Sequence, residues 1–138
     1  MVNKEILHKR LENLGKSLKV LKDLQKYSFD QFINNPLLYG SAERFLHLSI
    51  EALIDIGNHI ISDLELGEVH YYADIPSRLG EHGYLNDRQK NAFIKMIGFR
   101  NALVHEYVEI DRKIVFDILQ SNLHEIHEVQ KIFATFME

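Results

Sequence analysis

Residues 46–64 read LHLSIEALIDIGNHIISDL, and this stretch decides the fold because its apolar side chains repeat at helical spacing. The residues of this stripe and of its two edges are Phe45, Leu46, Leu48, Ile50, Ala52, Leu53, Ile56, Gly57, Ile60 and Leu64. A helix that is apolar over so wide an arc packs against neighbours on more than one side. We therefore expect a helix from Pro36 or Ser41 to Leu64 at the centre of a bundle. Gly57 inside the stripe predicts a close approach by another helix.

The flanking sequence predicts further helices on both sides of the central one. Leucines spaced 4, 3, 4 and 3 residues apart mark the first helix. Asn86 and Gln89 have the pattern of a capping box that opens another helix at Asp87. The stripe of the last helix contains one polar residue, Asn122, which in such a seam can set the register. The other expected spans are Lys4–Gln25, Ile75–His82 and a last helix that Asp111 caps and that runs to Phe136. The helix that opens at Asp87 carries Phe93, Met96, Ile97, Arg100 and Val104.

The arrangement of these elements indicates one class of fold. The 138 residues contain two prolines and seven glycines, so long helices meet few breakers. No β alternation is sustained, and neither a repeat nor a domain boundary is visible. The sequence thus predicts an all-α protein, an up-and-down bundle of four main helices plus a short fifth helix. We expect residues 1–138 to form a single domain.

Composition excludes several classes of protein. There is no cysteine, so neither a disulfide framework nor a thiolate metal site can form. No stretch approaches the ~18 apolar residues that span a membrane, and no run of signal-peptide type follows Met1, so we expect a cytoplasmic protein. The net charge of -4 argues against nucleic-acid binding by bulk electrostatics. Residues 78–113, with seven Lys and Arg against five acids, still allow a local basic face.

The side chains that suit chemistry lie in the segment GFRNALVHEY, residues 98–107. Arg100 is followed after four residues by His105, and Tyr107 comes two residues later. The fork of an arginine matches phosphate oxygens, and a histidine takes and gives protons near neutral pH. Together they can activate a ribose 2′-hydroxyl and stabilise the charge that builds on phosphorus, without a metal. The set therefore points to a phosphodiester substrate.

Helical geometry separates two of these residues. Five residues turn through ~500° on an α-helix, so Arg100 and His105 point about 140° apart, whereas Arg100 and Tyr107 nearly share a face. Either the helix tightens or ends near His105, or two copies of the chain combine their motifs around one groove. Since two-fold dimers are the commonest homo-oligomers, we expect a homodimer whose seam includes the helix that carries the motif.

The amino-acid sequence of this segment resembles that of one protein family. It resembles the signature of HepT-like proteins, a branch of the HEPN ribonucleases. That signature is an arginine, four residues, a histidine, any residue and a tyrosine, with a polar residue directly after the arginine, which is Asn101 here. The central helix resembles the same family in Ala42-Glu43-Arg44, in LSIEA at residues 48–52 and in DIGNHI at residues 55–60. Helix number and order agree as well, so the resemblance covers nearly the whole chain and implies a HEPN-like bundle.

The resemblance also implies a function. HepT-like proteins are dimeric, metal-independent endoribonucleases and the toxins of type VII-like toxin–antitoxin pairs. Their partner is a small MntA-like nucleotidyltransferase that transfers AMP to the motif tyrosine. By this likeness Arg100 and His105 are catalytic, Asn101 supports them, Tyr107 is the AMP acceptor, RNA is the substrate, and neither a cofactor nor a metal is needed.

Two other functions remain open from the residues alone. Glu51, Asp55 and His59 recur every four residues on one helical face, as metal ligands on a bundle can, but no matching set on a second helix completes a site. We expect instead that one of these carboxylates pairs with a core cation, for which Arg100 is a candidate. The other possibility is a non-catalytic module that binds nucleotide or a nucleotidyltransferase subunit.

An aromatic pair in the loop after the central helix also allows two interpretations. Tyr71 and Tyr72 can stack on nucleobases, as aromatic residues do in proteins that bind single strands. The alternative, which we prefer on the sequence alone, is a loop packed on the end of the bundle.

Overall fold

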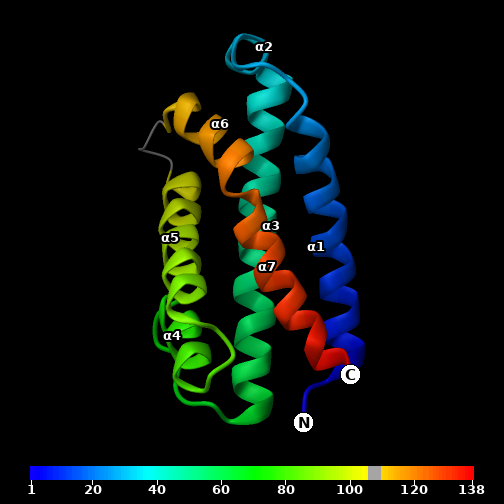
Figure 1. Cartoon of the computed structure of the whole chain (residues 1–138), viewed down its shortest axis with the longest axis vertical. Coiled ribbons are helices and arrows are strands. Elements are labelled where there is room, and N and C mark those ends of the chain that lie inside the picture. Colours follow the sequence, from blue (N-terminus) through cyan, green and yellow to red (C-terminus); the bar gives the residue numbers. More distant parts are fainter. Residues whose placement is uncertain (106–109) are drawn as a thin grey trace.

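The structure is a computed structural model that describes residues 1–105 and 110–138. Every element in these ranges is helical (Figure 1). No strand occurs in these two ranges, so the all-α prediction is confirmed. None of the helices within them has both the length and the apolar character of a membrane span. The elements are α1 (Lys4–Leu24), α2 (Phe29–Ile33), α3 (Pro36–Leu64), α4 (Asp74–Glu81), α5 (Asp87–Val104), α6 (Arg112–Ser121), α7 (Leu123–Ala134) and a 3-10 turn (Thr135–Met137).

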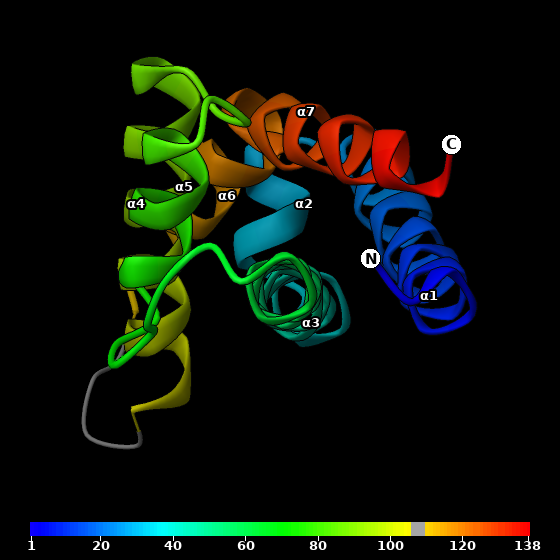
Figure 2. The same cartoon turned by 90° about the horizontal axis from the view of Figure 1, so that it is seen from below.

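Helix α3 is the axis of the molecule, as the width of its apolar arc predicts. It contacts each of the other six α-helices described. Figure 1 shows α1 on one side of it and α4 with α5 on the other, and the view along α3 in Figure 2 shows α7 crossing between them. Its buried side chains belong to one continuous core, whose members on α3 are Ala42, Leu46, Ile50, Leu53, Ile54, Ile56, Ile60 and Ile61.

Gly57 of α3 marks the tightest packing on this axis. A Cβ atom added at Gly57 would lie 2.6 Å from Cγ2 of Ile75 in α4 and 3.5 Å from Cζ of Phe133 in α7. Any side chain here would therefore force Ile75 of α4 to shift and would also touch Phe133 of α7. The close approach predicted from the sequence is confirmed, and it lets α4 and α7 pack on α3 at the same level.

Helix starts follow local capping chemistry. The predicted capping box at α5 is present: the N–H of Gln89 donates to Oδ1 of Asn86 at 2.8 Å, and the N–H of Asn86 donates to Oε1 of Gln89 at 3.0 Å. Ser28 and Gln31 form a second box, which opens the single helical turn α2. These bonds satisfy N–H groups that the first turn of a helix leaves without a partner.

The continuous last helix expected over Asp111–Phe136 is wrong, because the chain breaks at Asn122 into α6 and α7. In an unbroken helix the carbonyl of Leu119 would accept from the N–H of Leu123. Here it accepts instead from Nε2 of Gln25 at 2.9 Å, a residue at the end of α1. Asn122, with φ -116° and ψ -1°, caps α6, and its side-chain amide donates to Glu125. Asn122 is therefore a helix boundary and sets no register.

Replacement of Gly57 by alanine tests the role of this close contact. We expect Gly57→Ala to lower the free energy of unfolding by about 1–3 kcal/mol, because the new methyl group overpacks against Ile75. Gly40, in the same helix, has no atom within 4 Å of an added Cβ. Gly40→Ala is therefore the matched control and should stabilise by up to about 1 kcal/mol through helix propensity. Urea unfolding followed by circular dichroism measures both, and equal effects at the two glycines would contradict this account.

Candidate functional site

The C-terminal half of α5 holds the residues singled out by the motif. Phe93 and Ile97 are buried and anchor this helix on the core. Arg100 follows Ile97 by three residues and so lies on the same face, directed towards α3. Its side chain is only 14% exposed. The helix period thus explains why a permanently charged residue is held against the bundle.

Glu51 of α3 is the ionic partner of this arginine. Nη2 of Arg100 lies 3.5 Å from Oε2 of Glu51, whose side chain is 49% exposed. The prediction that a carboxylate of the central helix pairs with Arg100 is therefore confirmed. Removing one member of a largely covered ion pair leaves the other charge uncompensated. The pair thus holds the guanidinium in one place while Glu51 still reaches solvent.

Two further groups surround the guanidinium. The Cζ atom of Arg100 lies 5.2 Å from the centre of the Tyr72 ring, within the range of a cation–π interaction. Nη1 of Arg100 donates to Oδ1 of Asn101 at 3.2 Å. Glu51, Tyr72 and Asn101 therefore orient one cation from three sides, and Asn101 contacts Arg100 as the motif implies.

His47 is a member of this cluster that sequence reasoning missed. Its Nε2 atom lies 2.6 Å from Oε2 of Glu51, one helical turn away, and the imidazole is 20% exposed. Glu51 therefore links His47 to Arg100. The signal was present in the sequence, because His47 and Glu51 are four residues apart on the same helix, a spacing that brings side chains together.

His105 lies directly after the end of α5. The helix ends at Val104, His105 has the extended angles φ -78° and ψ 115°, and its N–H donates to the carbonyl of Ala102 at 3.3 Å. One of the alternatives drawn from helical geometry, a helix that ends near His105, is therefore confirmed. The imidazole is exposed, in contrast to Arg100. Tyr107, the fourth residue of the motif, lies outside the described residues.

The face of Glu51, Asp55 and His59 is divided between different partners. Asp55 forms an ion pair with Arg10 of α1, while Nε2 of His59 lies 3.9 Å from Oδ1 of the same Asp55. Within residues 1–105 and 110–138, no group of three or more His, Asp or Glu side chains is placed to hold a metal ion. The observed contacts of these three residues are ionic and link α3 to α1 and α5.

The aromatic loop after α3 lies beside the motif, contrary to our preference for a loop packed on the bundle end. Tyr72 covers Arg100, whereas Tyr71 is 76% exposed. Oδ2 of Asp74 accepts the N–H groups of His70 at 2.9 Å and of Tyr71 at 3.0 Å. These two bonds lower the pKa of the Asp74 carboxyl, and the bond from Tyr71 has the larger effect. The carboxyl is therefore ionised at neutral pH. The loop is thereby held in one conformation.

Hollows flank Tyr72 on two sides. One, of about 480 Å³, is lined by Glu51 and Asp55 of α3 and by Arg10 of α1. The other, of about 380 Å³, is lined by the residues from His70 to Ala73 together with Ile97 and Asn101. Both therefore open beside the Arg100 cluster.

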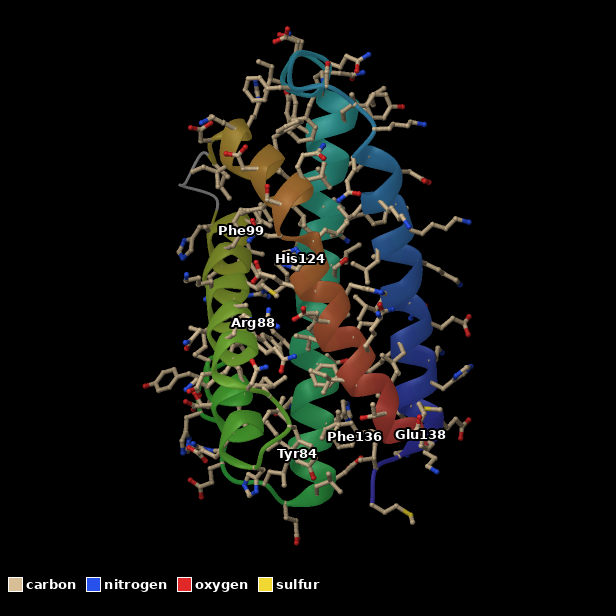
Figure 3. All side chains as sticks on the ribbon, viewed as in Figure 1. Tyr84, Arg88, Phe99, His124, Phe136 and Glu138 are labelled. Carbon is tan, nitrogen blue, oxygen red and sulfur yellow. The ribbon has the colours of Figure 1, made fainter. Side chains whose placement is uncertain are left out.

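A separate groove lies between α5 and the α6–α7 pair. It measures about 600 Å³, and Arg88, Phe99 and His124 line it, as Figure 3 shows. Arg88 pairs with Glu128 across it at 3.2 Å. Arg100 and Asn101 do not line this groove. It therefore offers an arginine and a histidine, Arg88 and His124, that line a hollow separate from those beside Tyr72 and are suited to control substitutions.

Comparison with known proteins identifies similar chains. A family model described as ribonuclease HepT-like matches residues 14–132. The tRNA nuclease HepT of Aphanizomenon flos-aquae is 34% identical over 111 residues, which cover 80% of this chain and 76% of that protein. The mRNA nuclease HepT of Shewanella oneidensis is 30% identical over 112 residues, covering 80% of this chain and 84% of that one.

Solved structures share the fold. A tri-AMPylated HEPN toxin of Shewanella oneidensis in complex with an MNT antitoxin superimposes with a TM-score of 0.87 at 24% identity, covering 98% of this chain and 99% of that one. The cytosolic protein YutE of Bacillus subtilis superimposes with a TM-score of 0.84 at 20% identity, covering 99% and 92% of the two chains. At these identities the likeness concerns the arrangement of helices.

Proposed function

The chain belongs to the ribonuclease HepT-like family, and from this premise we propose that it is the toxin of a type VII-like toxin–antitoxin pair that cleaves RNA without a metal. The observation that carries the proposal is the placement of Arg100, held by Glu51, Tyr72 and Asn101 one turn before α5 ends at an exposed His105. A cation that is held in place and an exposed imidazole five residues further along the chain are the two groups that phosphodiester cleavage needs.

The reaction that suits these groups begins at the ribose. An imidazole of His105 accepts the proton of the 2′-hydroxyl, and the 2′-oxygen attacks the adjacent phosphorus. The bond from phosphorus to the 5′-oxygen breaks, and that oxygen takes up a proton. Arg100 stabilises the negative charge on the phosphoryl oxygens, for which its guanidinium is already oriented. The products are a 2′,3′-cyclic phosphate and a free 5′-hydroxyl.

A homodimer completes this scheme. One chain supplies one His105, whereas the reaction needs a base for the 2′-hydroxyl and an acid for the leaving oxygen. A two-fold axis near the end of α5 would supply a second imidazole. Val104, an apolar residue at that end, is 41% exposed, which suits a seam between two copies.

We also propose that an MntA-like nucleotidyltransferase neutralises the toxin by transferring AMP to Tyr107. The support is the motif, and the description of the Shewanella toxin as tri-AMPylated and bound to an MNT antitoxin. In this transfer the tyrosine oxygen attacks the α-phosphorus of ATP, and pyrophosphate leaves. The attached phosphodiester adds about one negative charge to the motif that is proposed to bind substrate phosphate, and the nucleotide adds bulk to it.

Substitution of the motif tests catalysis. We expect Arg100→Ala and His105→Ala each to lower the rate of RNA cleavage by about 100-fold or more, because each removes a group that acts in the transition state. Cleavage is measured in excess chelator, and the products are examined for 2′,3′-cyclic ends. The matched controls Arg88→Ala and His124→Ala, in the groove that Arg100 does not line, should keep wild-type rates. Full activity of a folded His105→Ala protein would refute the mechanism, and RNA binding without cleavage by the wild type would favour a non-catalytic module.

The oligomeric state is the second test. We expect light scattering to give twice the chain mass of 16.2 kDa at micromolar concentration. Val104→Glu should shift the mass to that of one chain and abolish cleavage, because a charge at an apolar seam is costly to bury. A monomeric wild-type protein with full activity would contradict the shared site.

The modification is the third test. After incubation with the nucleotidyltransferase, ATP and magnesium, intact-mass spectrometry should show the gain of at least one adenylyl group on the wild-type chain. Tyr107→Phe keeps the ring but removes the acceptor oxygen, so it should not gain that mass and should stay active. A gain that persists in Tyr107→Phe would place the acceptor elsewhere, and no gain in the wild type would refute AMP transfer.

A further inference from the structure

The loop His70–Tyr72 combines three features that its packing does not explain. Tyr71 exposes 76% of its surface, although an aromatic ring gains by burial. Tyr84, another tyrosine on the surface, is by contrast 37% exposed and packs on Phe136 with 5.0 Å between ring centres (Figure 3). The ring of Tyr71 is therefore available to a ligand.

The loop is also held in place. Asp74 accepts the backbone N–H groups of His70 and Tyr71, and the carbonyls of Tyr71 and Tyr72 accept from the N–H groups of Asp74 and Ile75 at 2.9 and 3.0 Å. Each backbone segment around the ring is thus tied to the start of α4. A loop whose backbone is already fixed loses little conformational entropy when a ligand stacks on one of its side chains.

The position of the loop indicates what the ligand is. The hollow of about 380 Å³ at Tyr71 is also lined by Asn101, the neighbour of Arg100 in the chain. The side-chain oxygen of Asn101 accepts a hydrogen bond from Arg100, so the group that this amide can offer to a ligand is its NH2 donor. An aromatic face with an amide N–H near it suits a nucleobase, which has a π-face and carbonyl or ring-nitrogen acceptors on its edge.

We propose that the His70–Tyr72 loop is a stacking platform for an unpaired base of the RNA substrate, next to the phosphate that Arg100 binds. This inference rests on the proposed ribonuclease function and extends it to substrate choice. Tyr71 stacks on the base, and Asn101 donates to its edge. Tyr72 keeps its place on the guanidinium, so it separates the base from the Arg100–Glu51 pair. The preferred substrate is accordingly single-stranded at the cleavage site.

The probe that tests the platform is a short single-stranded 2′-O-methyl RNA containing 2-aminopurine, which cannot be cleaved through its 2′-oxygens. Stacking quenches 2-aminopurine fluorescence. We expect the wild type to bind and quench, Tyr71→Ala to bind about 5- to 150-fold more weakly without quenching, and Tyr71→Phe to behave as the wild type. Leu37→Ala, which removes another exposed apolar side chain that lines neither hollow beside Tyr72, is the matched control and should change nothing.

Cleavage kinetics provide an independent measurement. Tyr71→Ala should raise KM for single-stranded RNA by a similar factor with little change in kcat, since Tyr71 acts on binding and not on the reacting groups. Unchanged KM and quenching in a folded Tyr71→Ala protein that cleaves RNA would overturn the platform and leave the ribonuclease function standing. A change of light-scattering mass in Tyr71→Ala would place the residue in a seam between copies and would equally overturn it. A wild type that neither binds nor cleaves RNA would refute the function itself.

Discussion

The burial of α3 among all its neighbours is the constraint on which the structure depends. A helix in contact with six others must be apolar around most of its circumference, since a polar group buried without a partner costs several kcal/mol. The same burial requires Gly57, where α4 and α7 leave no room for a side chain. Ser49 is the one polar residue of α3 that is fully covered in the described ranges. The remaining polar residues of α3 lie on the strip of its surface that the neighbouring helices leave uncovered.

This uncovered strip links the core to the candidate site. Glu51 and Asp55 lie one turn apart on α3, and cations reach them from opposite sides, Arg100 from α5 and Arg10 from α1. The hollow that contains both carboxylates also contains Arg10 and Tyr72. Two carboxylates on one helix thus tie both flanking helices to the axis. The arginine proposed to bind phosphate is held by the same strip that stabilises the bundle.

The two principal residues of the motif differ in environment, and the difference matters for their proposed roles. Arg100 is largely covered and has three neighbours, so its charge is preorganised and little reorientation is needed in a transition state. His105 lies beyond the helix end and is exposed, which leaves the imidazole able to exchange protons with solvent. Because α5 ends at Val104, His105 does not continue the helix that carries Arg100. His47 adds a titratable neighbour to Glu51 on the side of α3.

Sequence alone determined where most of the helices lie, the central place of α3, the capping box at Asn86, the close approach at Gly57 and the motif. Each of these depends on periodicity, on spacing within one helix or on the likeness of short segments. Tertiary structure decided what depends on residues distant in the chain. Gln25 of α1 binds the carbonyl of Leu119 and thereby divides the last helix. The loop after α3 places Tyr72 against Arg100. Hydrophobic periodicity could not predict this contact, because a loop has no regular period. Arg100 pairs with Glu51 and Arg10 pairs with Asp55, and only the packing of α5 and α1 on α3 decides which cation reaches which carboxylate.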